Sequence, residues 1–357
     1  MNNLLKNLCV KSRVYQRRYR FKKTILSVCS VLAGGAFLAT PSSADTPNVV
    51  VSILPIHSLV QSVMNGVGDA DLLVDQGASP HGYSLRPSQV RALNKADLVV
   101  WVGESLETFL EKPLSQKSQQ TIVLELMDLE GVTLLENRTE GSWATDDHES
   151  HDDHGPEHDH GPEHDHDHDD THSSENAHEH EGHDHGKFDP HVWLSIENSR
   201  KIVQKVGAEL SKMDPSNAQA YQDNVDLTLA SLGMLKQDIT TQLSEVKDKP
   251  YLVFHDAYQY FEKEFSLNSI GAVTINPERK PGAKRITDLR EQIKQSGAVC
   301  IFSEPQFKPA IVNVLAEGLP IKKAELDPMG SHLGMGKDAY TGLLSALSLS
   351  IETCLSD

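Results

Sequence analysis

Short apolar segments alternate with segments of helical periodicity along most of this 357-residue chain, and this alternation constrains the fold more than any other feature. The run at 48–54 is apolar almost throughout, as buried parallel strands are. We expect strands at 48–54, 71–75, 98–102, 121–126, 251–254, 269–275, 298–302 and 321–326, and helices at 56–64, 87–94, 106–114, 196–213, 257–265, 285–295, 309–316 and 339–355. The pattern predicts an α/β fold with parallel sheets flanked by helices.

A second pattern divides this alternation into two blocks. Apolar residues recur every three or four positions from Ala218 to Val246, which predicts one helix over 215–246 with Asp214 as its N-cap. Such a helix would be about 48 Å long at 1.5 Å per residue. We interpret it as a rigid spine that joins two lobes. The expected organisation is a signal peptide at 1–44, an N-terminal lobe at 45–213, the linking helix at 214–247 and a C-terminal lobe at 248–357.

The first 44 residues have the pattern of a secretory signal peptide. Eight Lys and Arg precede Asp45, which is the first acidic residue, and an apolar run at 25–38 leads to the small residues Ser42, Ser43 and Ala44. The apolar run is too short to span a membrane. We therefore expect this segment to be removed and the rest of the chain to be exported.

Two cysteines remain after the expected cleavage, Cys300 and Cys354. An even pair in an exported chain predicts a disulfide. It would close a loop of about 55 residues and stabilise the fold by roughly 4 kcal/mol in the chain-entropy model. The alternative interpretation is two buried free thiols.

Residues 146–186 form a tract rich in His, Asp and Glu. It contains thirteen of the 18 histidines and, between Asp146 and His185, 16 acidic residues and no Lys or Arg. Without an apolar period it cannot form a packed core, so we expect it to be disordered. Its composition favours loose metal binding over the alternative of a solvated acidic linker. Its histidines are His148, His151, His154, His158, His160, His164, His166, His168, His172, His178, His180, His183 and His185.

The charge balance limits the class of partner. The chain has 51 Asp and Glu against 33 Lys and Arg, and it stays acidic when the basic leader and the acidic tract are both set aside. An acidic surface argues against nucleic acid as a partner and allows a cation as substrate.

Three histidines outside the tract stand where a ligand site is expected. His81 follows the strand at 71–75, His255 follows the strand at 251–254, and His191 lies in Asp189-Pro-His-Val-Trp-Leu. Asp327 follows the last strand. Ligands of open α/β sheets bind beyond the carboxyl ends of the strands. Three imidazoles with a carboxylate or a water suit Zn²⁺ better than Mg²⁺ or Ca²⁺.

Other residues near these ligands have less specific interpretations. His57 is expected to pack or cap, and His332 to be a solvated loop residue. A ligating imidazole usually donates its second N–H to a carboxylate. The candidates for that role are Asp189, Asp256, Glu104 and Glu304, while Trp101 and Trp193 are expected in the core.

Taken together, these motifs resemble the zinc-specific solute-binding proteins of ABC importers, the ZnuA type of the cluster A-I metal-binding family. The matching segments cover nearly all of 48–355 in order: Gly77-Ala-Ser-Pro-His-Gly-Tyr-Ser-Leu-Arg-Pro-Ser, Ala96-Asp-Leu-Val-Val-Trp-Val-Gly, Asp189-Pro-His-Val-Trp-Leu, Phe254-His-Asp-Ala-Tyr, Asn276-Pro-Glu, Pro281-Gly-Ala, Ser303-Glu-Pro-Gln-Phe and Leu326-Asp-Pro-Met-Gly. The family has two α/β lobes, one long linking helix, a metal site in the cleft between the lobes and a His-rich loop at this place in the chain.

The resemblance implies a set of ligands for one tightly bound Zn²⁺. The three histidine ligands fall on His81, His191 and His255, and the late carboxylate falls on Asp327. Pro80 stands where some zinc members carry a further Glu ligand, so the fourth ligand is Asp327 or a water, with Asp327 preferred. Manganese-binding relatives have Glu in the place of His255. The C-terminal disulfide of ZnuA-type members matches Cys300 and Cys354.

The expected function is capture of zinc in the periplasm by a monomer and its delivery to a cognate ABC permease, with no catalytic residues. Other periplasmic zinc-binding proteins are further candidate partners, and the His-rich tract is expected to scavenge or sense zinc. The alternatives are a Mn²⁺ or Fe²⁺ cargo, a periplasmic zinc store or chaperone, and a zinc hydrolase. The hydrolase is disfavoured because the chain has no His-Glu-x-x-His motif.

Overall fold

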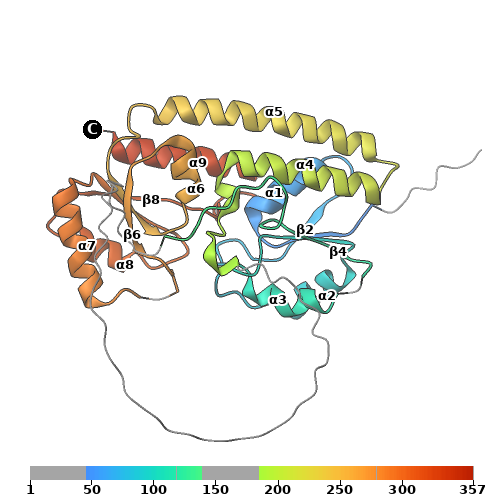
Figure 1. Cartoon of the computed structure of the whole chain (residues 1–357), viewed down its shortest axis with the longest axis horizontal. Coiled ribbons are helices and arrows are strands. Elements are labelled where there is room, and N and C mark those ends of the chain that lie inside the picture. Colours follow the sequence, from blue (N-terminus) through green and yellow to red (C-terminus); the bar gives the residue numbers. More distant parts are fainter. Residues whose placement is uncertain (1–45, 118, 139–184, 279, 357) are drawn as a thin grey trace, which may run out of the picture. The chain divides into compact units, whose positions relative to one another are not determined.

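Two four-stranded parallel sheets with identical strand connectivity form the framework of the chain (Figure 1). The computed structural model describes residues 46–117, 119–138, 185–278 and 280–356. The first half contains β1 (Val49–Val51), α1 (Leu54–Met64), β2 (Ala70–Leu72), α2 (Pro87–Lys95), β3 (Leu98–Trp101), α3 (Thr108–Ser115), β4 (Ile122–Glu125), the 3₁₀ turns η1 (His185–Lys187) and η2 (Val192–Leu194), α4 (Ile196–Met213) and α5 (Ala218–Leu243).

The second half repeats the alternation of strands and helices. It contains β5 (Tyr251–His255), α6 (Gln259–Phe265), β6 (Ser269–Thr274), α7 (Ala283–Ser296), β7 (Cys300–Ser303), α8 (Ala310–Ala316), β8 (Lys322–Glu325) and α9 (Ala339–Leu355). The strand orders are β2-β1-β3-β4 and β6-β5-β7-β8, and every pair is parallel. The predicted α/β fold with two flanked parallel sheets is confirmed.

The central strands are buried because helices cover both faces of each sheet, whereas most residues of β2, β4 and β8 are partly or fully exposed. β1 and β3 are buried along their whole length, as is β5. Parallel sheets of this kind have continuous apolar strands, which is the pattern that the sequence shows. In each sheet the chain order reverses next to the first strand, so the carboxyl ends of β1 and β5 lie at positions where such folds bind ligands.

The long helix is three residues shorter than predicted at each end. α5 begins at Ala218 and ends at Leu243, so its 26 residues span about 39 Å. Asp214 does not cap it: the Asp214 carboxylate accepts hydrogen bonds from Ser216 Oγ at 2.5 Å, Asn217 Nδ2 at 2.7 Å and Tyr221 Oη at 3.1 Å. These bonds close a turn between α4 and α5, which moves the helix start three residues beyond Pro215.

Helix α5 packs against α1 and α4, which accompany the first sheet, and against α9 and α6 of the second half (Figure 1). Gly207 of α4 lies against Val225 of α5, where an added Cβ atom would overlap the Val225 side chain. α9 also contacts α1, and the backbone N–H of Tyr340 donates to Ser58 Oγ at 2.8 Å. The described residues consequently belong to one compact unit.

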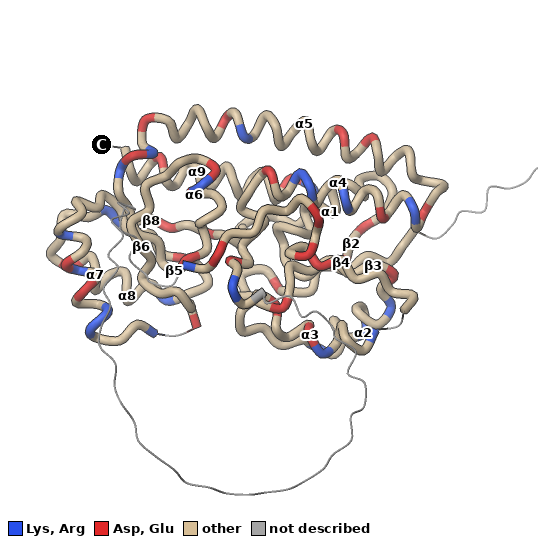
Figure 2. Tube along the Cα trace, in the orientation of Figure 1, with Lys and Arg blue, Asp and Glu red and all other residues tan. Residues whose placement is uncertain are grey.

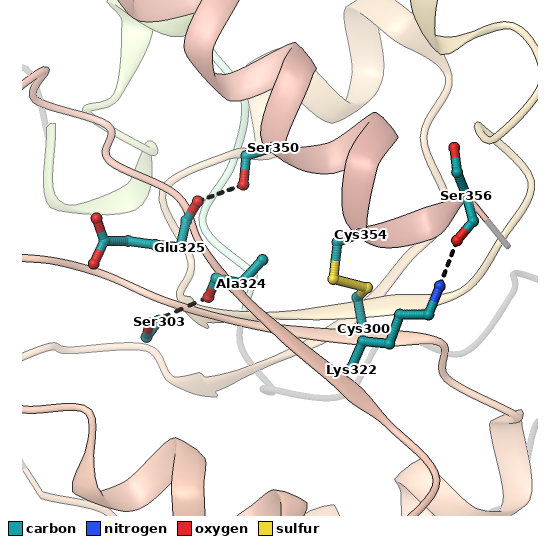
Figure 3. Close-up of a disulfide and its surroundings, with 8 residues drawn as sticks. All are labelled: Cys300, Ser303, Lys322, Ala324, Glu325, Ser350, Cys354 and Ser356. Carbon is teal, nitrogen blue, oxygen red and sulfur yellow. Dashed lines mark hydrogen bonds between the residues drawn. A yellow bond between two sulfur atoms is a disulfide. The ribbon is translucent and has the colours of Figure 1, made fainter.

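A disulfide joins Cys300 at the start of β7 to Cys354 in the last turn of α9 (Figure 3). The Cα atoms are 6.1 Å apart and the cysteines are separated by 54 positions in the chain. Ser350 Oγ donates to the Glu325 carbonyl at 2.6 Å, and Lys322 Nζ donates to the Ser356 carbonyl, so α9 is also held against β8. The predicted disulfide is confirmed.

Several predictions fall on residues outside the described ranges. The signal peptide at 1–44 lies there, as does the tract at 146–186 up to residue 184; His185 is described only as the first residue of η1. None of the helices in the described ranges is long and apolar enough to cross a membrane. Lys and Arg are interspersed with Asp and Glu along the described trace (Figure 2).

Candidate metal site

Three histidines that are far apart in the sequence come together in the structure. His81 lies in the loop after β2, His191 directly precedes η2, and His255 is the last residue of β5. One ring nitrogen from each lies within 4.8 Å of the others, and they are the one such His, Cys, Asp or Glu group among the described residues. Three imidazole nitrogens at this separation can ligate a single ion.

The His191 and His255 rings face each other through their Nε2 atoms, which are 3.4 Å apart. Two imidazoles on one tetrahedral Zn²⁺, with Zn–N of about 2.0–2.1 Å, have their nitrogens about 3.3–3.4 Å apart. The pair therefore already has the spacing that a shared zinc ion requires. His81 completes a triangle, with ring centroids 5.5 Å from His191 and 5.7 Å from His255.

Carboxylates hold the Nδ1 atoms of His191 and His255. Asp189 Oδ1 lies 2.7 Å from His191 Nδ1, and Glu304 Oε1 and Oε2 lie 2.6 and 2.8 Å from His255 Nδ1. Each carboxylate selects the tautomer with its proton on Nδ1, which leaves the Nε2 lone pair for a metal. Asp189 and Glu304 thus take the role for which four acids were candidates.

The other two candidate acids lie elsewhere. Asp256 pairs with Arg138 at 3.0 Å, and Arg138 also contacts Glu262 at 2.8 Å. Glu104 lies near Glu125. The pKa of Glu125 is raised mainly by burial, and then by the charges of Asp128 and Glu104. Arg138 could not be connected with the site from the sequence, because its contacts with Asp256 and Glu262 cross more than a hundred positions of chain.

The local sequence explains how His191 is held. Asp189 Oδ1 also accepts the backbone N–H of His191 at 3.0 Å, which closes an Asx-type turn around Pro190. Tyr260 Oη donates to the Asp189 carbonyl at 2.7 Å, so α6 holds the turn from the side of the second sheet. Burial raises the pKa of Asp189 to about 7, opposed by its hydrogen bond to the His191 N–H and by Arg138.

The three histidines have different protonation preferences. Burial lowers the pKa of His81 to about 2, helped by the neighbouring His191 and His255, and burial with His255 also lowers the pKa of His191. Burial alone would lower the pKa of His255, but the charge and hydrogen bond of Glu304 raise it above its ordinary value. A proton on His255 Nε2 therefore competes with a metal ion more strongly than a proton on His191 or His81 does.

The histidines line a small cavity of about 10 Å³. Its other walls are Ser79 and Pro80 from the His81 loop, Glu304, Gln306 and Phe307 from the loop after β7, and Trp193, Pro328 and Met329. The space accepts about one water-sized particle. It is too small for an organic ligand, and it suits a species of atomic size such as a metal ion or a water.

Asp327 is not brought into the histidine cluster. Its Oδ1 atom accepts the backbone N–H groups of Met329 and Gly330, both at 3.0 Å, and Oδ2 accepts that of Ser331. Gln306 Nε2 donates to Oδ1 at 2.6 Å. The carboxylate is therefore already occupied in closing the turn after β8, and it lines a different cavity together with His332.

The remaining histidines and tryptophans have structural positions. His57 is buried, with Nε2 2.9 Å from the Ala70 carbonyl, as the packing interpretation expected. His332 is exposed and 3.8 Å from Glu325. Trp101 and Trp193 are buried as predicted, and Trp193 Nε1 donates to the Pro328 carbonyl at 2.9 Å beside the histidine cluster.

Comparison with known proteins agrees with this geometry. The family model described as "Zinc-uptake complex component A periplasmic" matches residues 49–354. The high-affinity zinc uptake system protein ZnuA of Brucella suis biovar 1 (strain 1330) is 41% identical over 331 residues, which cover 92% of this chain and 98% of that protein. Its namesake from Yersinia pestis is 36% identical over 327 residues, covering 91% and 96%.

The fold has a counterpart among solved structures. A crystal structure of ZnuA covers 87% of this chain and 100% of its own, with a TM-score of 0.67 at 21% identity. At that identity the match concerns the fold. The family model and the relatives, each spanning almost the whole chain, lead to one conclusion: the chain belongs to the ZnuA family of zinc-uptake components.

Proposed function

We propose that this protein captures Zn²⁺ in the periplasm with His81, His191 and His255 and delivers it to a cognate ABC permease. The observation that carries the proposal is the convergence of three ring nitrogens within 4.8 Å, two of them on imidazoles whose Nδ1 atoms are held by buried carboxylates. The near relatives named as high-affinity zinc uptake proteins support the same cargo.

The donor set favours zinc over the alternative cargoes. Three neutral imidazoles are borderline-soft ligands that suit tetrahedral Zn²⁺, whereas Mn²⁺ prefers sites with more oxygen. Asp327, the preferred fourth ligand in the sequence prediction, already accepts five hydrogen bonds through its two oxygens. A water as the fourth ligand costs none of them, so we now favour the water.

Zinc is bound as cargo and is not used for catalysis. The carboxylates nearest the histidines each hold an imidazole Nδ1, so neither is available as the general base that a hydrolase needs. The tract at 146–186 would then act as an accessory that scavenges or senses zinc, since its histidines bind ions more loosely.

Zinc titration tests the proposal with three proteins: the full chain, the chain without residues 146–186, and the full chain with His81→Ala. We expect one tight zinc in the first two, and its loss in the third while weaker binding remains. A competition with Mn²⁺ on the second protein should leave zinc bound. If deletion of 146–186 removes all tight binding, the protein is instead a zinc store based on the tract.

A further inference from the structure

One buried polar atom in the wall of the histidine cavity has no hydrogen-bond partner among the described residues, namely Gln306 Oε1. Gln306 follows β7 and lies two positions beyond Glu304, which holds His255. A buried carbonyl oxygen loses its hydrogen bonds to water on folding, and native structures rarely leave this loss uncompensated. An unpaired acceptor on a residue that lines a ligand cavity is therefore a candidate to accept a hydrogen bond from the ligand.

The orientation of the Gln306 amide is determined by its other end. Nε2 donates to Asp327 Oδ1 at 2.6 Å and to Ser331 Oγ at 2.7 Å. Reversing the amide would place its oxygen against the Asp327 carboxylate, where it would be repelled. Asp327 is itself fixed by the backbone N–H groups of the turn after β8. The turn therefore holds Gln306 with Nε2 directed to Asp327 and Oε1 at the opposite end of the planar amide.

The cavity has space for the missing donor. Its volume of about 10 Å³ accommodates roughly one water-sized particle beside the ring nitrogens. Three imidazoles satisfy three positions of tetrahedral Zn²⁺ and leave the fourth for a water. Such a water is polarised by the metal and is a strong hydrogen-bond donor, so it requires an acceptor nearby.

We propose that Gln306 Oε1 accepts a hydrogen bond from a water that is the fourth ligand of the captured zinc. This inference rests on the function proposed above. Asp327 then supports zinc binding indirectly, because it orients Gln306 and Gln306 orients the water. Gln306 is a positioning residue for the fourth ligand.

The choice of an amide has a chemical consequence. A glutamine oxygen accepts a hydrogen bond but does not take up the proton at neutral pH, so the bound water stays a ligand and is not converted into a nucleophile by this residue. A carboxylate in the same place would be a general base and would also add a negative charge that slows release of the cation. Gln306 therefore suits a site that must bind zinc and later give it up.

The test uses the full chain with Gln306→Met, which keeps the side-chain length but removes both amide atoms. Gln295→Met is the matched control, because Gln295 is exposed on α7 and its amide contacts only Glu291 among the described residues. Each protein is also prepared with His81→Ala. Subtracting the metal binding of each His81→Ala protein from that of its parent gives the binding at the three-histidine site alone.

We expect Gln306→Met to weaken the tight zinc site about 10- to 100-fold, as loss of an outer-shell partner typically does. The visible spectrum of Co²⁺ at the site should change as well, because the fourth ligand loses its orientation. Gln295→Met should alter neither quantity. If Gln306→Met lowers the melting temperature of the metal-free protein, Gln306→Asn repeats the test, since it keeps an amide but withdraws Oε1 by one methylene.

Unchanged zinc affinity and an unchanged Co²⁺ spectrum in both Gln306 variants would overturn the inference. So would a zinc-loaded crystal structure in which an Asp327 oxygen is the fourth ligand. These outcomes are distinct from failure of the proposed function, which would appear as the absence of any tight zinc that His81→Ala removes from the parent protein.

Discussion

Glu304→Gln should weaken zinc binding. It should also lower the pH at which the zinc affinity begins to fall. The Glu304 side chain is 1% exposed, and its two oxygens lie 2.6 and 2.8 Å from His255 Nδ1. Glutamine preserves the shape but removes the charge from a buried, charge-assisted hydrogen bond. Outer-shell substitutions of this kind typically cost 10- to 100-fold in metal affinity, or about 1.4–2.7 kcal/mol.

The sign of the pH effect follows from the competition between metal and proton. Glu304 raises the pKa of His255, so in the parent protein zinc must displace a proton from Nε2 once the pH falls below that raised pKa. Glu304→Gln lowers this pKa, so protons compete less and the affinity loss should narrow at low pH. Chelator competition from pH 8 to pH 5 measures both curves, and parallel curves separated by a constant factor would refute this account of the pair.

The remaining predictions concern pH, the disulfide and the helix contact. In the parent protein, apparent zinc affinity should fall about tenfold per pH unit below the raised pKa of His255, because one proton is displaced per ion; a flat profile between pH 7 and 5 would contradict this. Replacing Cys300 and Cys354 together by Ser should lower the free energy of unfolding by roughly 4 kcal/mol in denaturant titrations, with zinc affinity retained, because the bridge closes a loop of 54 positions far from the histidines. Gly207→Ala should destabilise the protein by about 1–3 kcal/mol, because the added Cβ overlaps Val225 where α4 meets α5; an unchanged melting temperature would show that the helices separate without cost.

The alternation of elements could be predicted from the sequence because it depends on local patterns. The ends of α4 and α9 agree with the apolar periodicity, whereas α1 begins at Leu54, two residues earlier than predicted. Pro55 explains this difference, since it has no N–H to lose and suits the first turn of a helix. The predicted start of α5 was wrong because the Asp214 side chain accepts hydrogen bonds within its own turn. Apolar periodicity does not reveal such bonds.

The three histidines could be found because each stands near the carboxyl end of a strand or in a recognisable motif. Their carboxylate partners could be named only as candidates, since Glu304 meets His255 across 49 positions of chain. Gln306 could not be found at all from residue type alone. Gln306 is identified by its unpaired Oε1 atom. That oxygen is left without a partner because folding brings Asp327 and Ser331 to the nitrogen end of the amide.

We propose that one zinc ion binds between His81, His191 and His255, whose ring nitrogens converge. Anomalous diffraction at the zinc edge, on crystals of the protein loaded with a single equivalent of Zn²⁺, tests it most directly. The account predicts one dominant peak about 2.0–2.1 Å from one nitrogen of each histidine, with Nε2 as the ligand atom of His191 and His255. A dominant peak away from these three rings, or one bound through Nδ1 of His255 with Glu304 displaced, would contradict it.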